Sequence, residues 1–307
     1  MNTSNSSAIK AEARFLTAVK TGRVSHACFL SCLDTLFAEQ AARRAAALFC
    51  TGAAEAGRLS SCVDYTELGS EPIKADMVRA VTAELTKRSF SGGGRAIYLK
   101  NAHTMNEPAQ NALLKTLEEP PEGTLFLLTG NEHALLPTIR SRCSRVTLPA
   151  PGKEEVAAAL RGVGANEAEA LRYAAMGITS GRALRLYQDE EYRALREKAQ
   201  ALLCAVLSGK LPFEGIAALA GGGEDAAVFM LSLLRDILLY KTRGLVAENA
   251  DRQAEAAKFA ARFTNGRIHD MITVLAESLA RLNTNVSAQA VFTWTFTQLA
   301  KEISQTG

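Results

Sequence analysis

The segment from Cys32 to Glu39 follows the first apolar run of the chain, where a phosphate-binding loop would be expected. Such a loop needs the pattern GxxxxGK[ST]: glycines turn backbone N–H groups toward the phosphates, the lysine neutralises charge, and the hydroxyl holds magnesium. The segment reads CLDTLFAE and contains neither glycine nor lysine. Because Asp34 and Glu39 would repel phosphate, the segment has the position of a nucleotide loop without its chemistry.

A second requirement of ATP hydrolysis is a pair of carboxylates at the end of a later strand, one for magnesium and one to orient water. The candidate strand, residues 97–99, runs instead into Lys100 and Asn101, with His103 two residues later. A cation and an amide therefore stand where two carboxylates are needed. Both halves of an ATP site are missing together, so we expect a chain that has kept the architecture and lost the catalysis.

Short apolar runs that alternate with helix-length amphipathic stretches place these segments in the first half of the chain. Such alternation is typical of βα units around a parallel sheet. The expected strands are residues 26–31, 63–65, 96–99, 124–129 and 145–148, and the expected helices lie near residues 36–50, 73–89 and 107–118. In the second of these helices, Ile73, Met77, Val81 and Leu85 recur every four residues and predict one apolar face.

The second half of the chain has a different pattern. Residues 149–152 read PAPG, which continues neither a strand nor a helix and predicts a hinge. Two or three short helices are expected within residues 153–187. From Tyr192 onward the periodicity is only helical, with breaks at glycine, proline and asparagine. This predicts four or five further helices, among them residues 226–241 and 287–301.

Composition and charge are those of an ordinary globular chain. The 307 residues are 48% hydrophobic and carry a formal net charge of +3, which neither demands nor excludes nucleic acid, because phosphate binding depends on where Lys and Arg cluster. No stretch approaches the roughly 18 apolar residues of a membrane span, so we expect a cytoplasmic location and no membrane partner. Six scattered cysteines predict buried thiols rather than disulfides or a zinc site.

Two further segments carry a resemblance to a known family. Residues 106–121, NEPAQNALLKTLEEPP, and residues 135–143, LLPTIRSRC, resemble the signature of the AAA+ clamp loaders of bacterial DNA polymerase III. The similarity spans at least residues 20–150. It continues more weakly through GRALRL, residues 181–186, to the helices around residues 285–299.

This resemblance implies an α/β AAA+ fold and a division of the chain into three domains. An AAA+ domain with a P-loop NTPase-like parallel five-stranded sheet and a degenerate nucleotide site would cover residues 1–149. A small helical lid, residues 150–190, and an all-α collar domain for oligomerisation, residues 191–307, would follow.

Within that family the chain resembles a degenerate member rather than the ATP-hydrolysing gamma and tau type. Ala38 takes the position of the phosphate-loop lysine and Glu39 that of the hydroxyl. Lys100 and Asn101 replace the acidic pair, and Gly181 falls where working members carry a lid arginine that senses nucleotide. The resemblance therefore implies a subunit with no ATPase activity of its own, no cofactor and no bound metal.

The motif that survives is Ser141-Arg142-Cys143. In this family the arginine projects into the ATP site of an adjacent subunit. A guanidinium supplied in trans stabilises the charge that builds up during phosphoryl transfer and is worth roughly 10³–10⁵ in rate, and its planar fork matches phosphate oxygens as lysine cannot. The alternative interpretation is that Arg140 and Arg142 are surface residues in ordinary ion pairs.

Other positions have simpler interpretations. Many relatives carry a four-cysteine zinc module where this chain has only Cys50 and Cys62, so no zinc is expected and both are interpreted as thiols. His103 has no partner carboxylate or cysteine nearby in the sequence and is interpreted as a polar residue at a strand end. In clamp loaders the LLKTLEEPP helix lies toward the chamber that holds DNA, so Lys115 and Asn111 are candidate phosphate contacts.

The predicted function is that of a non-catalytic clamp-loader subunit of the DNA polymerase III holoenzyme. It would help to load the sliding clamp onto primed DNA and supply Arg142 to a neighbour's ATP site. The expected partners are clamp-loader ATPase subunits of the gamma/tau type, a delta-type subunit, the sliding clamp and, through the assembled loader, primer-template DNA.

Two alternatives belong to other classes. One is a clamp-loader ATPase of the gamma/tau type with unusual motifs, against which Ala38 and Lys100 argue. The other is a degenerate relative that serves as a binding module in another assembly. The intact SRC motif argues against this second alternative, because an arginine finger acts only beside an ATPase.

Overall fold

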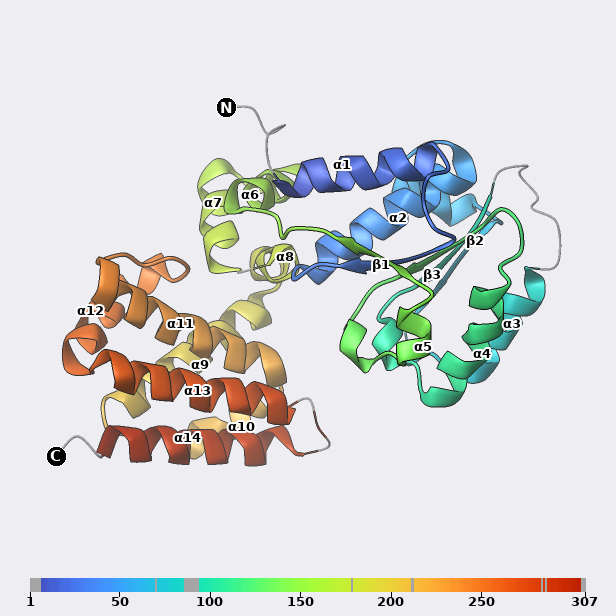
Figure 1. The fold of residues 1–307 in the computed structure, drawn as a ribbon. Helices are drawn as coiled ribbons and strands as arrows, with labels where there is room; N and C mark the ends of the chain where they lie inside the picture. The colour runs from blue at the N-terminus through green and yellow to red at the C-terminus, as the bar shows by residue number, and fades with distance from the viewer. Residues whose placement is uncertain are drawn as a thin grey trace. The chain divides into compact units, whose positions relative to one another are not determined.

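The computed structural model describes residues 7–69, 71–85, 94–177, 179–210, 213–282, 284 and 286–304. The chain separates into two compact units, Met1–Val156 with Thr179–Gly181, and Ala157–Ile178 with Arg182–Gly307. The first contains a sheet with helices on both faces, and the second contains helices (Figure 1). The finer division into an AAA+ domain, a lid and a collar stays a prediction.

The first unit is built on a parallel sheet of five strands. They are β1 (Ala27–Ser31), β2 (Tyr65–Leu68), β3 (Arg95–Leu99), β4 (Thr124–Leu128) and β5 (Ser144–Thr147). Their order across the sheet is β2-β3-β4-β1-β5, and every neighbouring pair is parallel. The predicted five-stranded parallel sheet is confirmed. Because the carboxyl ends of parallel strands share one edge, the segments that follow β1 and β3 come together there.

Helices cover both faces of this sheet (Figure 1). One face carries α1 (Ser7–Lys20) and α2 (Thr35–Thr51), and the other carries α3 (Ala75–Glu84), α4 (Glu107–Glu118) and the short α5 (Pro137–Arg140). Alternate strand residues enter the two layers: Cys28 and Leu30 pack with α1 and α2, whereas Ala27 and Phe29 pack with α3, α4 and α5. A sheet covered on both faces has strands that are apolar throughout, which is why apolar runs locate most of them.

Local sequence sets the ends of the helices that bear the candidate site. The side chain of Asp34 caps α2, and Gly52 ends that helix with a φ of 74°, a left-handed conformation that glycine adopts without a Cβ clash. The side chain of Asn106 caps α4, and Pro120, two residues beyond its last residue, Glu118, prevents the helix from continuing. The prediction of a helix at residues 107–118 is confirmed.

Two elements of the first unit differ from the sequence-based expectation. The strand expected at residues 63–65 is β2, Tyr65–Leu68, and Val63 is 74% exposed. As an edge strand, β2 carries polar residues that a search for apolar runs misses. The helix expected at residues 73–89 is α3; Val78 rather than Met77 lies in its core, and residues 86–93 lie outside the described part of the chain.

The second unit consists of helices, with α6 and α8 each beginning in the first unit. They are α6 (Lys153–Gly162), α7 (Glu167–Met176), α8 (Ser180–Gln188), α9 (Glu190–Leu207), α10 (Phe213–Ala220), α11 (Gly223–Arg243), α12 (Gln253–Arg262), α13 (Asn265–Leu282) and α14 (Ala288–Ser304). As predicted, three short helices follow residues 149–152. In the described chain six more follow, where four or five were expected, and the helices predicted at residues 226–241 and 287–301 correspond to α11 and α14.

α11 is the central helix of the second unit. It packs against α9, α12 and α13, while α14 packs against α9, α10 and α13. Arg196 of α9 is 1% exposed, and its Nη atoms donate to Asp251 at 2.8 Å and to Asn249 at 2.9 Å. A buried guanidinium requires such paired, hydrogen-bonded surroundings, and this one ties the connection between α11 and α12 to α9.

Candidate functional site

The start of α2, where the sequence predicts the position of a phosphate-binding loop, holds the carboxylate of Asp34. Asp34 is 1% exposed; its Oδ1 accepts from the backbone N–H of Phe37 at 3.2 Å, and its Oδ2 accepts from that of Ser180 at 2.6 Å. The N-terminus of a helix is a natural anion site, where N–H groups and the helix dipole favour negative charge. Here Asp34 supplies that anion, so a phosphate would meet both a filled position and a like charge.

The two positions that would hold magnesium in a working site form an ion pair with each other. The Nζ of Lys100 lies 3.0 Å from Oε2 of Glu39, and the Glu39 side chain is 12% exposed. Ala38, at the phosphate-loop lysine position, is buried and contributes only a methyl group. The ammonium of Lys100 thus places a positive charge beside the carboxylate of Glu39.

The backbone around Lys100 is tightly turned. Asn101 has a φ of 52°, in the left-handed region that residues other than glycine seldom adopt. Gly69, after β2, has a φ of 116°, and a Cβ built on it would lie 1.9 Å from the carbonyl oxygen of Lys100. The segment after β3 therefore approaches the end of β2 so closely that only glycine fits there.

The Lys100–Glu39 pair is part of a larger charged network at this edge of the sheet. Arg43 of α2 lies 3.8 Å from Glu39 and 2.7 Å from Glu67 of β2, and the hydroxyl of Tyr65 donates to Glu67 at 2.5 Å. Burial acts to raise the pKa of Glu67, but hydrogen bonds from Arg43 and Tyr65 outweigh it and hold that pKa below its usual value. Burial and the Glu67 hydrogen bond raise the pKa of Tyr65. The network keeps Glu67 ionised and Tyr65 neutral.

Gly181, predicted to replace a nucleotide-sensing arginine, lies in the first turn of α8. A Cβ built on it would be 3.5 Å from the Cβ of Leu36, in the first turn of α2. The start of α8 therefore lies against the start of α2, next to the Asp34–Ser180 hydrogen bond. Glycine has no side chain, so this position contributes no charge.

Arg142 lies just beyond α5 with its side chain 32% exposed. Its Nη1 donates to the carbonyl oxygen of Thr138 at 2.9 Å and to the hydroxyl of Ser141 at 3.4 Å. Its Nη2 donates to the carboxylate of Glu118, in the last turn of α4. The guanidinium is therefore accessible at the surface of the unit and held by three oxygen atoms.

The other two residues of the motif have different surroundings. Ser141 is exposed, and its hydroxyl donates to the carbonyl oxygen of Thr138 at 3.1 Å. Burial raises the pKa of the Cys143 thiol to about 11, and Glu132 adds to the effect. At neutral pH the thiol is protonated and poorly nucleophilic, and it packs against the core beneath α3, α4 and α5. Cys143 thus anchors the segment that carries Arg142.

Gln110, which our sequence-based interpretation did not single out, connects α4 to the segment before α5. It is 5% exposed; its Nε2 donates to the carbonyl of Met105 at 3.1 Å, and its Oε1 accepts from the N–H of Leu136 at 2.7 Å. The available signal was a polar residue on the buried face of α4, between Ala109 and Leu113. Such a side chain must be hydrogen-bonded to be tolerated in the core.

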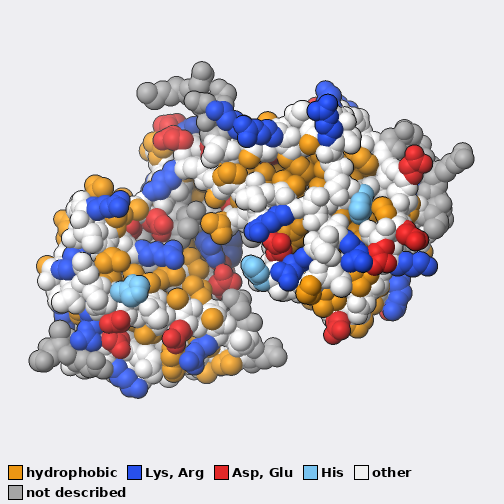
Figure 2. Space-filling view, in the orientation of Figure 1, with side chains coloured by type: hydrophobic (Ala, Val, Ile, Leu, Met, Phe, Trp, Pro, Cys, Tyr) orange, Lys and Arg blue, Asp and Glu red, His pale blue; other side chains and the backbone are white. Residues whose placement is uncertain are grey.

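Lys115 and Asn111, the candidate DNA contacts, are both exposed on α4. On the face drawn in Figure 2, Lys and Arg side chains are spread over the surface and interleaved with Asp and Glu. The arrangement agrees with the small net charge of +3. Contact of either residue with DNA stays a prediction.

Cys50, Cys62 and His103 were considered as metal ligands, and their contacts are with the protein itself. Burial, with the nearby thiol of Cys62, raises the pKa of Cys50 to about 12. The Nδ1 of His103 accepts from the N–H of Asn131 at 3.2 Å, and burial lowers its pKa, so it is neutral. Over the described residues, His, Cys, Asp and Glu nowhere gather in a group of three that could hold a metal ion. In the same residues, no helix is both long enough and apolar enough to span a membrane.

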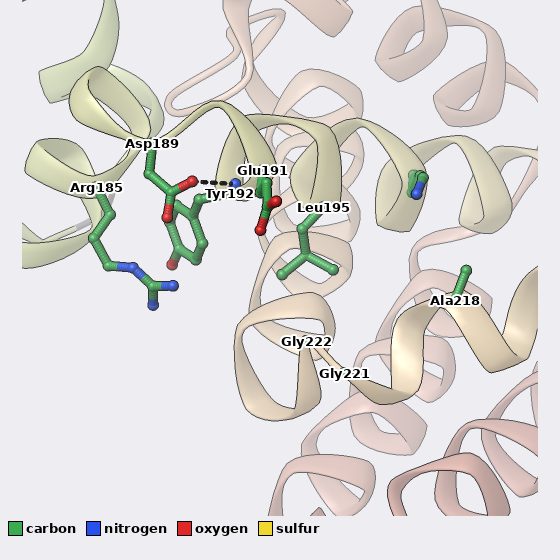
Figure 3. Close-up of a pocket in the computed structure, with 9 residues that line it drawn as sticks. Arg185, Asp189, Glu191, Tyr192, Leu195, Ala218, Gly221 and Gly222 are labelled. Carbon is green, nitrogen blue, oxygen red and sulfur yellow. Dashed lines mark hydrogen bonds between the residues drawn. The ribbon is translucent and has the colours of Figure 1, made fainter.

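A pocket of about 300 Å³ lies in the second unit, between α8, α9 and the loop before α11 (Figure 3). Arg185 stacks on the ring of Tyr192 with its Cζ 3.8 Å from the ring centroid, and Asp189 caps α9. Arg185 and Lys198 line the pocket together with Asp189 and Glu191. With two basic and two acidic side chains, the pocket has no electrostatic preference for phosphate groups.

The family match among the comparisons with known proteins lies within the first unit. The family described as "DNA polymerase III, delta subunit" matches residues 8–152. The chain is 32% identical to DNA polymerase III subunit delta' of Escherichia coli K12 over 211 residues, 67% of this chain and 63% of that relative. The chain belongs to the DNA polymerase III delta-prime family. This confirms the resemblance carried by residues 106–121 and 135–143.

Other delta-prime relatives match shorter parts of the chain. The delta' subunit of Pseudomonas aeruginosa is 38% identical over 124 residues, which cover 35% of this chain and 38% of that relative. The matches thus span less than two thirds of the length of these delta-prime relatives. Among solved structures, a DNA polymerase III gamma subunit-related protein of Thermotoga maritima is similar over 95% of this chain and 99% of its own, with 18% identity and a TM-score of 0.47.

Proposed function

We propose that this chain is a non-catalytic subunit of the clamp loader of the DNA polymerase III holoenzyme, and that it completes the ATP site of a neighbouring subunit. The observation that carries the proposal is the ion pair between Glu39 and Lys100. A magnesium ion cannot share that position with an ammonium group, because the two cations would repel each other. Membership of the delta-prime family supports the same assignment.

Three features argue against hydrolysis by the chain itself. Asp34 fills the anion position at the start of α2, Ala38 offers no charge to a phosphate, and Lys100 replaces a metal ligand. Each one removes a different requirement of phosphoryl transfer: phosphate binding, charge neutralisation and metal binding. Restoring any single group would leave the other two missing.

The chemistry that the chain would supply in trans is that of Arg142. Its guanidinium is accessible at the surface, and the peptide oxygen of Thr138 fixes it at 2.9 Å. Placed beside the phosphates of an adjacent subunit, it would stabilise the charge that develops on the transferred phosphoryl group. Ser141 would support the guanidinium, and the buried Cys143 would hold the segment in place.

The partners follow from the same proposal. The ATP site would belong to a clamp-loader ATPase of the gamma/tau type, and a delta-type subunit, the sliding clamp and primer-template DNA would meet the chain in the assembled loader. The helices from residue 191 to the end would form the collar through which the subunits assemble, and residues 150–190 would form a lid. The chain would act where this loader acts, in the cytoplasm.

The proposal is tested by binding and assembly together. Isothermal titration of the isolated chain with Mg-ATP is expected to give no saturable heat, while a gamma/tau-type subunit as a positive control binds. Gel filtration is expected to show co-elution with the cognate clamp-loader subunits. Saturable binding and hydrolysis by the isolated chain would support the alternative of a gamma/tau-type ATPase. Failure to co-elute would support a binding module of another assembly.

A further inference from the structure

Glu118 is a second functional candidate next to Arg142. It lies in the last turn of α4 with its side chain 50% exposed, and its Oε1 accepts a hydrogen bond from Nη2 of Arg142. The two residues come from different elements, 24 positions apart in the chain. The contact therefore links the guanidinium to α4 as well as to α5.

The stability of α4 does not account for an acidic residue at this position. The carboxyl end of a helix carries partial negative charge and favours cations, yet the chain places Glu118 and Glu119 there. Glu118 is compensated by Arg142, whereas Glu119 forms no ion pair in the described residues. Arg142 therefore offsets the unfavourable charge that Glu118 places at the end of α4.

The contacts of Arg142 leave part of its guanidinium free for a ligand. Two N–H groups of Nη1 point to Thr138 and Ser141, and one of Nη2 points to Glu118. A guanidinium has five N–H donors, so within the described chain two remain for phosphate oxygens. Glu118 thus restricts the rotamers of a long, flexible side chain without using all of its donors.

We propose that Glu118 is a positioning residue, which holds the guanidinium of Arg142 in the orientation that a neighbour's phosphate requires. This inference rests on the proposed trans role of Arg142. A free arginine side chain loses rotamer entropy when it is fixed by a ligand, and a group that is already oriented loses less. The effect belongs to the catalytic step, because the guanidinium would stabilise the charge that develops on the phosphate and leaving oxygens as the phosphoryl group is transferred.

The test is ATP hydrolysis by the loader reconstituted with its cognate subunits, the sliding clamp and primed DNA. Glu118→Ala is expected to lower kcat at the affected site by up to about five-fold, the upper range for losing one exposed ion pair, with little change in KM for ATP. Glu118→Gln keeps an oxygen acceptor and is expected to lose less. Glu119→Ala, which alters the adjacent carboxylate, is expected to match the wild type.

A double-mutant cycle separates positioning from a general structural role. In the Arg142→Ala background, Glu118→Ala is expected to cause no further loss, and gel filtration of every variant confirms assembly. A further loss in that background, an effect no larger than that of Glu119→Ala, or a rise in rate would each overturn the inference. An unchanged rate in Arg142→Ala alone would overturn the proposed function and this inference with it. A fall in Arg142→Ala with none in Glu118→Ala would overturn only the inference.

Discussion

Lys100 and Glu39, the residues predicted to replace two magnesium ligands of a working site, form an ion pair with each other at 3.0 Å. By this prediction, Glu39 has a carboxylate in place of a neutral hydroxyl, and Lys100 has an ammonium group in place of a carboxylate. Either change alone would leave an uncompensated charge beside Glu67 and Arg43, whereas the two together are neutral. The charges of the two side chains therefore compensate each other.

Removing the ammonium tests this compensation. Lys100→Ala is expected to lower the free energy of unfolding by about 1 kcal/mol, the upper range for an ion pair that is not fully buried, because Glu39 and Glu67 then share only Arg43. Urea denaturation of the isolated chain measures the change. Lys115→Ala, an exposed lysine on α4, serves as the control. Equal stability of the two variants would mean that the Lys100–Glu39 pair contributes nothing.

The depressed pKa of Glu67 makes a prediction about acid. A carboxyl whose pKa is lower in the folded state stabilises the fold above its unfolded pKa, and this stabilisation is lost as the pH falls through the folded pKa. The difference in unfolding free energy between the wild type and Glu67→Gln is therefore expected to shrink between about pH 7 and about pH 3. Denaturation curves at several pH values measure it. A difference that stays constant or grows on acidification would contradict the assignment.

At the scale of elements, Asp34 joins two helices. Its carboxylate caps α2 through Phe37 and accepts from the N–H of Ser180, the first residue of α8. In a nucleotide-binding fold a phosphate would satisfy the N-terminus of the helix that follows the first strand. Here the side chain of Asp34 accepts hydrogen bonds from both helix ends.

Asp34→Ala is expected to lower the free energy of unfolding by about 2 kcal/mol, since it removes a helix cap and a buried, charge-assisted hydrogen bond. The amide of Ser180 is expected to exchange faster with solvent, as measured by hydrogen exchange. Asp76→Ala, in the first turn of α3 with a side chain that is 94% exposed, is the matched control. Unchanged exchange at Ser180 would contradict a role for Asp34 in joining the helices.

The sequence located the elements whose signals are local. Three of the five strands, β1, β3 and β4, are buried apolar runs, and α4 has a capping asparagine and a terminating proline pair. β2 was misplaced because an edge strand is not apolar throughout. The helix predicted at residues 287–301 is α14, Ala288–Ser304, although the segment before it contains no glycine or proline.

In the candidate site, too, the features with a local sequence signal could be predicted, whereas the long-range contacts could not. Ala38, Glu39 and Lys100 could be assigned from the sequence because a motif fixes their spacing. The Lys100–Glu39 pair itself, and the partners Glu118 and Gln110, could not be found, because each contact joins segments far apart in the chain. Arg142 meets Glu118 across 24 positions, and Gln110 meets Leu136 across 26. Only the packing of α4 beside α5 brings them together.

At the scale of the whole molecule, the proposed function is that of a chain that has no ATP site of its own and completes the ATP site of another subunit. The ion pair between Lys100 and Glu39 would stay in place during each cycle of ATP hydrolysis, while the neighbouring subunit would bind, hydrolyse and release nucleotide. Hydrolysis by that neighbour would then depend on assembly with this chain. The accessible group through which the dependence would act is the guanidinium of Arg142.

The most direct test of this claim is single-turnover ATP hydrolysis by the reconstituted loader, comparing the wild type, Arg142→Ala and Arg140→Ala. We expect Arg142→Ala to slow hydrolysis at the adjoining site by a factor on the order of 10³, with assembly intact by gel filtration. Arg140→Ala, which removes an exposed arginine of α5, is expected to leave the rate unchanged. An unchanged rate in Arg142→Ala would contradict the account and leave Arg142 as a structural residue that links α4 to α5.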